Sequence, residues 1–271
     1  MKFEELKRLI EGKEELAKKP LSEVKIKKVS GIPIIEGVTT VGDLIPKEMK
    51  EEDLKPFLRE TELCDYNHPK IKGWADRIEK NSKAKNKNEL ALAIDKEVKN
   101  KILYALKEWS LKASEIAAGY EGMCFNKTLL SMAIKRCFGI PTKMRLYLHK
   151  SPVFKFLGEY SPIFKKVSKT PHVVGVHYLD GWQEFDIHLD EELEKKLYRF
   201  IFPEEELELI GDYANPEECA ISANQLPSFF RGHLVSFPIS KLRDKEEKRK
   251  EKAEEFFEKL NSELKFLRGG S

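Results

Sequence analysis

Apolar residues recur every three or four positions in the middle of the chain, a spacing that predicts amphipathic helices. One apolar stripe lies within residues 71–78 and a second within residues 90–105. The polar run 81–89 separates them, and its last residues can cap the second helix. A third apolar stretch, residues 124–138, is followed by Gly139, so we expect a helix that stops at this glycine.

The apolar pattern changes to every second residue after this helix, which predicts β-strands. Strands are expected over residues 143–149, 172–179 and 182–189. Asp180-Gly181, between the last two, is a hairpin signal.

The two flanks of the chain show weaker patterns. Residues 1–20 and 48–60 are expected to form helices, and residues 24–45 contain β-branched stretches broken by Gly and Pro, as in short strands. Residues 241–267 predict a charged helix with one apolar stripe, whereas residues 203–240 give no clear pattern.

Length and composition indicate one core domain with helical extensions at both ends. The chain has 271 residues, of which 41% are hydrophobic and 35% charged. A chain of this length can bury a large core without disulfides or metals. We expect an N-terminal extension over residues 1–66, a core over residues 67–200 and a C-terminal extension over residues 201–271.

Charge and hydropathy exclude several classes of function. The 49 Lys and Arg residues nearly balance the 46 Asp and Glu residues, so no nucleic-acid partner is expected. No apolar run approaches the ~20 residues of a membrane-spanning helix, and the first residues lack the apolar centre of a secretion signal. We therefore expect a cytoplasmic protein with no membrane association, while the oligomeric state stays open. Abundant Lys and Glu beside few Gln favour a heat-adapted source.

The four cysteines contain no Cys-x-x-Cys pair, so the common zinc spacings are absent, and no metal or cofactor is expected. They are Cys64, Cys124, Cys137 and Cys219. Cys124 differs from the others because it opens an apolar helix, where the positive end of the helix dipole stabilises a thiolate. The alternative is that Cys124 is a small buried apolar residue, the commoner fate of cysteine.

Two residues further along the chain complete a set of nucleophile, base and acid. His172 begins a predicted strand 48 residues after Cys124, and Asp186 lies on the next strand, 14 residues further. A cysteine, a histidine base and an acid that orients the imidazole form a catalytic triad. Their order on a helix start and two successive strands is more specific than any one of them.

Two motifs around these residues resemble the transglutaminase-like superfamily. The first is GMCFNKTLLSMAIKRCFGIPTK, residues 122–143, in which Gly-x-Cys leads into an apolar helix and then Arg-x-x-Gly-Ile-Pro. The second is HVVGVHYLDGWQEFD, residues 172–186, in which a histidine opens a strand and a Trp precedes the aspartate by four. The resemblance covers about residues 68–190.

The resemblance implies a papain-like α+β core, with the nucleophile at the start of a helix packed on an antiparallel sheet that carries His and Asp. It implies Cys124 as the nucleophile, His172 as the general base and Asp186 as the orienting acid. Known members cross-link, deamidate or cleave peptides and proteins through a thioester. The expected partner is therefore a peptide or protein acyl substrate.

The resemblance also implies an aromatic or amide group near the oxyanion of the reaction. Tyr104, expected at the end of the preceding helix, is a candidate for this group, and a core tyrosine is the alternative. Gly122 is a second candidate for the oxyanion and substrate-binding residues, because it lets the backbone turn tightly before Cys124. The backbone N–H of Cys124 is a further oxyanion donor.

Two features depart from the family pattern. Val174 occupies a position where the family usually has a Trp. A two-residue hairpin turn would pair Gly175 with Asp186 and direct Asp186 away from His172, because side chains alternate between the faces of a strand. A wider turn or a bulge would restore the geometry.

Two remaining features each have a structural and a functional interpretation. His177 and His188 are expected to be surface histidines, with a metal site as the less favoured alternative. The aromatic segment 153–164 is expected either to pack on the core as a small helix or to form a lid over the cleft.

Two classes of function therefore stand. The first is a cysteine enzyme that acts on an acyl or amide substrate through a thioester, with hydrolysis favoured over cross-linking because water is always available. The second is a binding module that keeps the fold without the chemistry.

Overall fold

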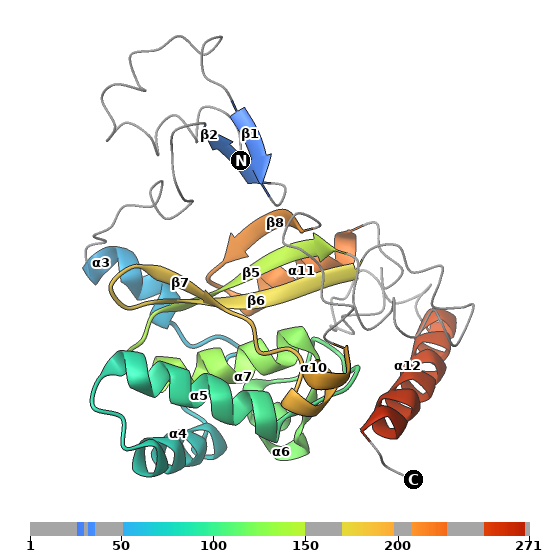
Figure 1. Ribbon diagram of the computed structural model, residues 1–271, viewed down its shortest axis with the longest axis horizontal. Coiled ribbons are helices and arrows are strands. Elements are labelled where there is room, and N and C mark those ends of the chain that lie inside the picture. The colour runs from blue at the N-terminus through green and yellow to red at the C-terminus, as the bar shows by residue number, and fades with distance from the viewer. Residues whose placement is uncertain are drawn as a thin grey trace.

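A layer of helices packs against a four-stranded antiparallel sheet in the computed structural model (Figure 1). The residues that the structure describes are 26–29, 32–35, 51–149, 170–197, 207–226 and 247–268. The α+β class expected from the sequence is confirmed. Within the described residues, no helix is long and apolar enough to cross a bilayer.

Four helices form the helical layer. They are α4 (Pro69–Ser82), α5 (Lys87–Lys101), α6 (Ala113–Gly119) and α7 (Cys124–Cys137). The apolar stripes predicted for α4 and α5 are buried. The predicted cap of α5 is confirmed at Asn86, whose side-chain oxygen accepts a hydrogen bond from Glu89 N at 2.9 Å.

Helix α7 is the centre of the fold, with α4, α5 and α6 on one side and the sheet on the other (Figure 1). Every residue from Cys124 to Arg136 is buried. A helix buried on all sides needs partners for its charged side chains. Lys135 Nζ lies 2.7 Å from both carboxylate oxygens of Asp95, and Arg136 Nη2 donates to Thr142 O at 2.9 Å.

The sheet has the strand order β7-β6-β5-β8, and all neighbouring strands are antiparallel. The strands are β5 (Thr142–His149), β6 (Thr170–Tyr178), β7 (Trp182–Phe185) and β8 (Glu208–Tyr213). The first three agree with the predicted strands, although β7 is shorter than expected. Strand β8 lies in the region 203–240, which has no clear pattern of apolar residues.

The hairpin between β6 and β7 has a three-residue turn. Tyr178 pairs with Trp182, and the turn closes at Gly181, whose φ of 140° is a backbone conformation that favours glycine. The two-residue turn considered from the sequence is therefore wrong, and the wider turn is present.

This wider turn shifts the register by one residue. Gly175 pairs with Phe185 rather than with Asp186, so Asp186 follows in the position that shares a face with His172. A Cβ on Gly175 would lie 1.9 Å from the Phe185 ring, so glycine is required where this ring crosses β6.

Helix α5 ends at Lys101, earlier than the apolar stripe predicted. The next residues form the short strand β3 (Leu103–Tyr104), which pairs in parallel with β4 (Glu121–Gly122). Leu103 N donates to Tyr120 O at 2.9 Å, so pairing with a distant segment replaces the last helical turn. The placement of Tyr104 at a helix end is thus corrected to a strand.

Further elements lie before and after this core. They are β1 (Ile26–Val29), β2 (Ile32–Ile35), α3 (Glu51–Leu54), η3 (Lys55–Leu58), α10 (Glu191–Leu197), α11 (Pro216–Gln225) and α12 (Glu247–Leu267). Phe257, Leu260 and Leu264 of α12 are buried in the same core as Cys64 and Cys219. Residues from both expected extensions therefore contribute to one core.

Candidate active site

Cys124 is the first residue of α7 and is 6% exposed. The start of the helix is fixed by Asn126, whose side-chain oxygen accepts from Met123 N at 3.1 Å. Asn126 also donates through Nδ2 to Glu108 O at 2.8 Å. The first N–H groups of a helix have no acceptor within the helix, so this end favours negative charge on the sulfur.

Gly122 precedes this helix start on strand β4. A Cβ at this position would lie 2.7 Å from the Cβ of Asn126. Glycine therefore lets the capping side chain of Asn126 close over the backbone just before Cys124. This is a packing role, two residues before Cys124, and a role of Gly122 in substrate binding stays a prediction.

His172 lies on β6, and its ring is held between Cys124 and Asp186. Its Nε2 is 2.8 Å from Asp186 Oδ2, and the ring also hydrogen-bonds to the side chain of Cys124. Burial of the ring disfavours the imidazolium, but the charge and hydrogen bond of Asp186 and the hydrogen bond with Cys124 outweigh it. They raise the pKa of His172 to about 10. A histidine hydrogen-bonded to both a cysteine and a carboxylate is the acid–base partner that a cysteine nucleophile needs.

Asp186 follows the last residue of β7 and accepts hydrogen bonds on both oxygens. Oδ2 meets His172, and Oδ1 accepts from the backbone N of His188 at 3.1 Å. Desolvation by the surrounding side chains opposes ionisation of the Asp186 carboxyl group. His188 and His172 outweigh this effect and hold the pKa of Asp186 well below its usual range. The carboxylate thus stays charged beside His172, although 41% of its side chain is exposed.

His188 is a member of this group that the sequence did not reveal. Its Nδ1 lies 2.7 Å from Asp186 Oδ1, and its ring packs edge-on against the ring of His172 with centroids 4.7 Å apart. The expectation of a surface histidine is therefore wrong. The signal that could have found it is the Asp-x-His spacing, which lets the residue two positions after an aspartate bond back to it.

The same expectation is wrong for His177, which is buried on the other face of β6. Its Nδ1 lies 3.1 Å from Lys135 Nζ, and its ring stacks on Phe185 with centroids 5.3 Å apart. Burial and the nearby Lys135 charge lower the pKa of His177 to about 4. His177 therefore belongs to the packing between α7 and the sheet, away from Cys124.

Tyr104 lies beside the site from strand β3. It is buried, and its ring meets that of His188 edge-on with centroids 6.2 Å apart. Burial, with the nearby negative charges of Cys124 and Asp186, raises the pKa of Tyr104. Its hydroxyl therefore remains protonated and able to donate a hydrogen bond near the sulfur.

The donor atoms of His172, Asp186 and His188 lie within 4.8 Å of one another, a spacing that could also hold a metal ion. Each carboxylate oxygen already lies within hydrogen-bond distance of a histidine nitrogen. We therefore interpret this group as a hydrogen-bonded network. Val174 is 5% exposed and lies on β6 two residues after His172.

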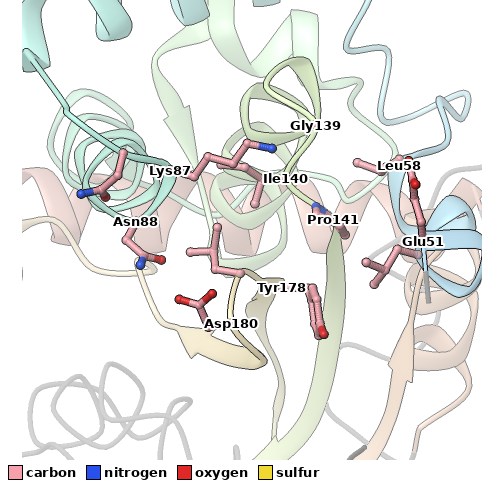
Figure 2. A pocket seen from close by; sticks show the side chains of 12 residues that line it. Glu51, Leu58, Lys87, Asn88, Gly139, Ile140, Pro141, Tyr178 and Asp180 are labelled. Carbon is pink, nitrogen blue, oxygen red and sulfur yellow. The ribbon is translucent and has the colours of Figure 1, made fainter. Parts of the chain in front are cut away.

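A separate pocket of about 370 Å³ opens at the other end of α7 (Figure 2). Its lining includes Lys87, Gly139 and Asp180, and the Lys87 side chain points towards the Gly139 turn. Helix α7 rises about 20 Å between Cys124 and Cys137, and Gly139 lies beyond its far end. The pocket is therefore distinct from the candidate active site.

The segments 153–164 and 1–20 lie outside the described residues, so the lid and helix expected there stay predictions.

Comparisons with known proteins found a similarity to a solved structure. No protein-family model and no curated protein matches the chain. Among solved structures, the chain is similar to a putative cysteine protease from Cytophaga hutchinsonii, with 18% sequence identity and a TM-score of 0.46. The match covers 65% of this chain and 52% of that protein, so the chain spans about half of its length. The site is therefore interpreted from its own geometry.

Proposed function

We propose that this protein is a cysteine hydrolase of the transglutaminase-like type, which cleaves an acyl or amide bond of a peptide or protein through a thioester. One observation carries the proposal. Cys124 begins a buried helix and hydrogen-bonds to His172, whose Nε2 meets Asp186 at 2.8 Å. This is the arrangement that a cysteine nucleophile, its acid–base partner and an orienting carboxylate need.

The proposed reaction has two halves. The thiolate of Cys124 attacks the carbonyl carbon, the His172 imidazolium gives its proton to the leaving amine, and the C–N bond breaks to leave a thioester. Water then attacks the thioester while His172 takes its proton. The C–S bond breaks, the acid product leaves, and the thiolate–imidazolium pair is restored.

Two donors are proposed to stabilise the oxyanion that forms in each half. The backbone N–H of Cys124 lies at the start of α7, where it has no acceptor within the helix. The second is the hydroxyl of Tyr104, which is buried and carries a proton because its pKa is raised by burial and by nearby negative charges. Gly122 contributes by allowing the tight backbone approach to this point.

Selective reactivity of Cys124 tests the nucleophile. Iodoacetamide at pH 6 to 7 should label Cys124 at least ~10-fold faster than Cys137, because only Cys124 has a base that favours its thiolate. Mass spectrometry of the digested protein gives each rate, and C137S is the matched control. Equal rates for all four cysteines of the folded protein would contradict the proposal.

Trapping of the thioester then tests the substrate class. Peptide and glycopeptide pools are incubated with the protein, quenched in acid and analysed for acyl adducts on Cys124. The C124S variant should form none. If added amines leave the products unchanged, this result favours hydrolysis of the thioester over transfer of the acyl group to an amine.

A binding module without catalysis is the second candidate. The observation that favours it is Val174, which replaces the Trp usually found two residues after the catalytic histidine. In this case peptides bind the wild-type protein and C124S equally, and no adduct forms.

A further inference from the structure

We propose that His188 is a positioning residue of the active site, which fixes Asp186 so that one carboxylate oxygen stays directed at His172. This inference rests on the proposed function, because it assigns a role within the same Cys124–His172–Asp186 set. It concerns a residue that lies two positions after Asp186 and acts on the set through this carboxylate.

The geometry gives His188 two contacts to one oxygen. Its backbone N lies 3.1 Å from Asp186 Oδ1 and its ring Nδ1 lies 2.7 Å from the same atom. A carboxylate only accepts hydrogen bonds, so Nδ1 carries the hydrogen. With Oδ1 held in this way, the second oxygen is directed at His172 Nε2, 2.8 Å away.

Asp186 needs such a restraint because of where it lies. The strand ends at Phe185, so ladder hydrogen bonds no longer fix the backbone at Asp186. Its side chain is 41% exposed, which would let it rotate towards water. His188 is itself 79% covered, and its ring packs between those of His172 and Tyr104. A ring enclosed on two sides has little freedom to release Asp186.

The charges around this group agree with a neutral His188. Burial lowers the pKa of His188 despite the charge of Asp186, and His172 and Lys127 act in the same direction as burial. Asp186 faces His172, His188, Tyr104 and Lys127. A neutral His188 donates to Asp186 without neutralising its charge, so the full carboxylate charge acts on His172.

Two variants separate the donor from the bulk of the ring. H188N keeps a donor nitrogen close to the place of Nδ1, whereas H188L fills similar space without a donor. If Asp186 is released, its support for the charged form of His172 weakens and the pKa of His172 falls. A less basic His172 is a weaker base for the Cys124 thiol, so Cys124 reacts more slowly with alkylating reagents.

The first experiment measures His172 itself, without any substrate. Histidine NMR titrations are recorded on the full chain in the C124S background, with H188L, H188N or D186N added, in the presence of a chelator. We expect H188L to lower the pKa of His172 by about one unit or more, D186N to lower it further, and H188N to restore at least half of the loss.

The second experiment measures iodoacetamide labelling of Cys124 at pH 7. H188L should slow it about tenfold, H188N about threefold or less, with unchanged melting temperatures for both. If D186N lowers the pKa of His172 but H188L leaves pKa and labelling at the wild-type values, the inference on His188 fails alone. If D186N also changes nothing, the proposed function fails at its triad.

Discussion

At the level of single residues, helix α7 buries charged side chains, which costs free energy. Burial lowers the pKa of Lys135 to about 8, although Asp95 opposes this shift. Burial likewise lowers the pKa of Lys127 to about 7, although Asp190 opposes it, and Lys127 donates to Lys99 O at 2.8 Å. A buried ion pair is weak evidence for stability, but removing one partner leaves an uncompensated charge.

Asp95 should therefore be essential for stability. We expect D95N to lower the free energy of unfolding by about 3–5 kcal/mol, because Lys135 then either keeps a buried charge without its carboxylate or must give up its proton in order to stay buried. Urea unfolding at pH 7 measures the loss. The double variant D95L/K135M, which removes both charges, should recover most of it.

The surface pair Lys107–Glu121 is the matched control for this prediction. Its side chains are 37% and 47% exposed, and the two charged atoms lie 2.7 Å apart. E121Q should change the free energy of unfolding by less than ~1 kcal/mol, since exposed pairs contribute little. A D95N variant as stable as E121Q would show that Lys135 does not need its partner.

At the level of elements, the β6–β7 hairpin decides whether the site can form. The Phe185 ring crosses β6 at Gly175, stacks on His177, and has Lys135 Nζ 3.2 Å from its centroid. The ring is therefore enclosed on several sides. The same pairing places Asp186 on the face of His172.

A methyl group at Gly175 should disturb this hairpin. We expect G175A to lower the free energy of unfolding by about 1–3 kcal/mol, since its Cβ would overlap the enclosed Phe185 ring. It should also slow iodoacetamide labelling of Cys124, because Asp186 follows Phe185 directly. Chemical unfolding and the labelling assay give the two readouts.

Gly73 provides the control for G175A. It lies inside α4, and a Cβ there would meet nothing within 4 Å. G73A should therefore stabilise the protein by about 0.5–1 kcal/mol. A G175A variant as stable and as reactive as the wild-type protein would mean that the Phe185 ring can move aside at no cost.

The elements that could be predicted from the sequence are those with a local signal. The start of α7 at Cys124 and its end before Gly139 follow from apolar spacing and from the glycine. The strand end at Tyr104 could not be read locally, because its partner Gly122 lies 18 residues further along the chain. Strand β8 was missed for a similar reason, since it is defined by its pairing with β5.

The candidate site shows the same division. Cys124 and His172 have local signals, a helix start and a strand start. The contact of Asp186 with His172 depends on the three-residue turn, which Asp180-Gly181 alone does not specify. His188 has the sequence pattern of an exposed strand residue, but the strand ends at Phe185, and beyond this end the ring bonds back to Asp186, two residues earlier.

At the level of the whole molecule, the C-terminal helix joins the segment that carries Tyr104. Asn261 of α12 pairs with both backbone groups of Leu106, accepting from its N at 2.7 Å and donating to its O at 3.0 Å. Arg268, just after the helix, donates to Tyr104 O at 2.7 Å. The last described helix thus supports the segment that carries Tyr104 beside Cys124.

Arg268 also holds the buried carboxylate of Asp190. Its Nη2 lies 2.6 Å from Asp190 Oδ2, the oxygen that also accepts from Tyr104 N at 3.0 Å. Asp190 is 3% exposed. Burial opposes its ionisation, but the hydrogen bond and charge of Arg268 and the hydrogen bond from Tyr104 N lower the pKa of Asp190.

Removal of Arg268 should therefore destabilise the protein in a pH-dependent way. We expect R268M to lower the free energy of unfolding by about 3–5 kcal/mol at pH 7, because Asp190 keeps a buried charge without its partner. A carboxyl whose pKa is lower in the folded state adds stability above its ordinary pKa, and that stability is lost as the pH falls. The deficit of R268M should therefore shrink as the pH falls through the ordinary pKa of aspartate, ~3.9, towards the lower pKa of Asp190.

Urea unfolding of R268M at several pH values measures this deficit. The control variant is K265M, which changes the exposed Lys265 of the same helix turn. A deficit that is equal at all pH values, or equal to that of K265M, would show that the contact with Asp190 does not join α12 to the site.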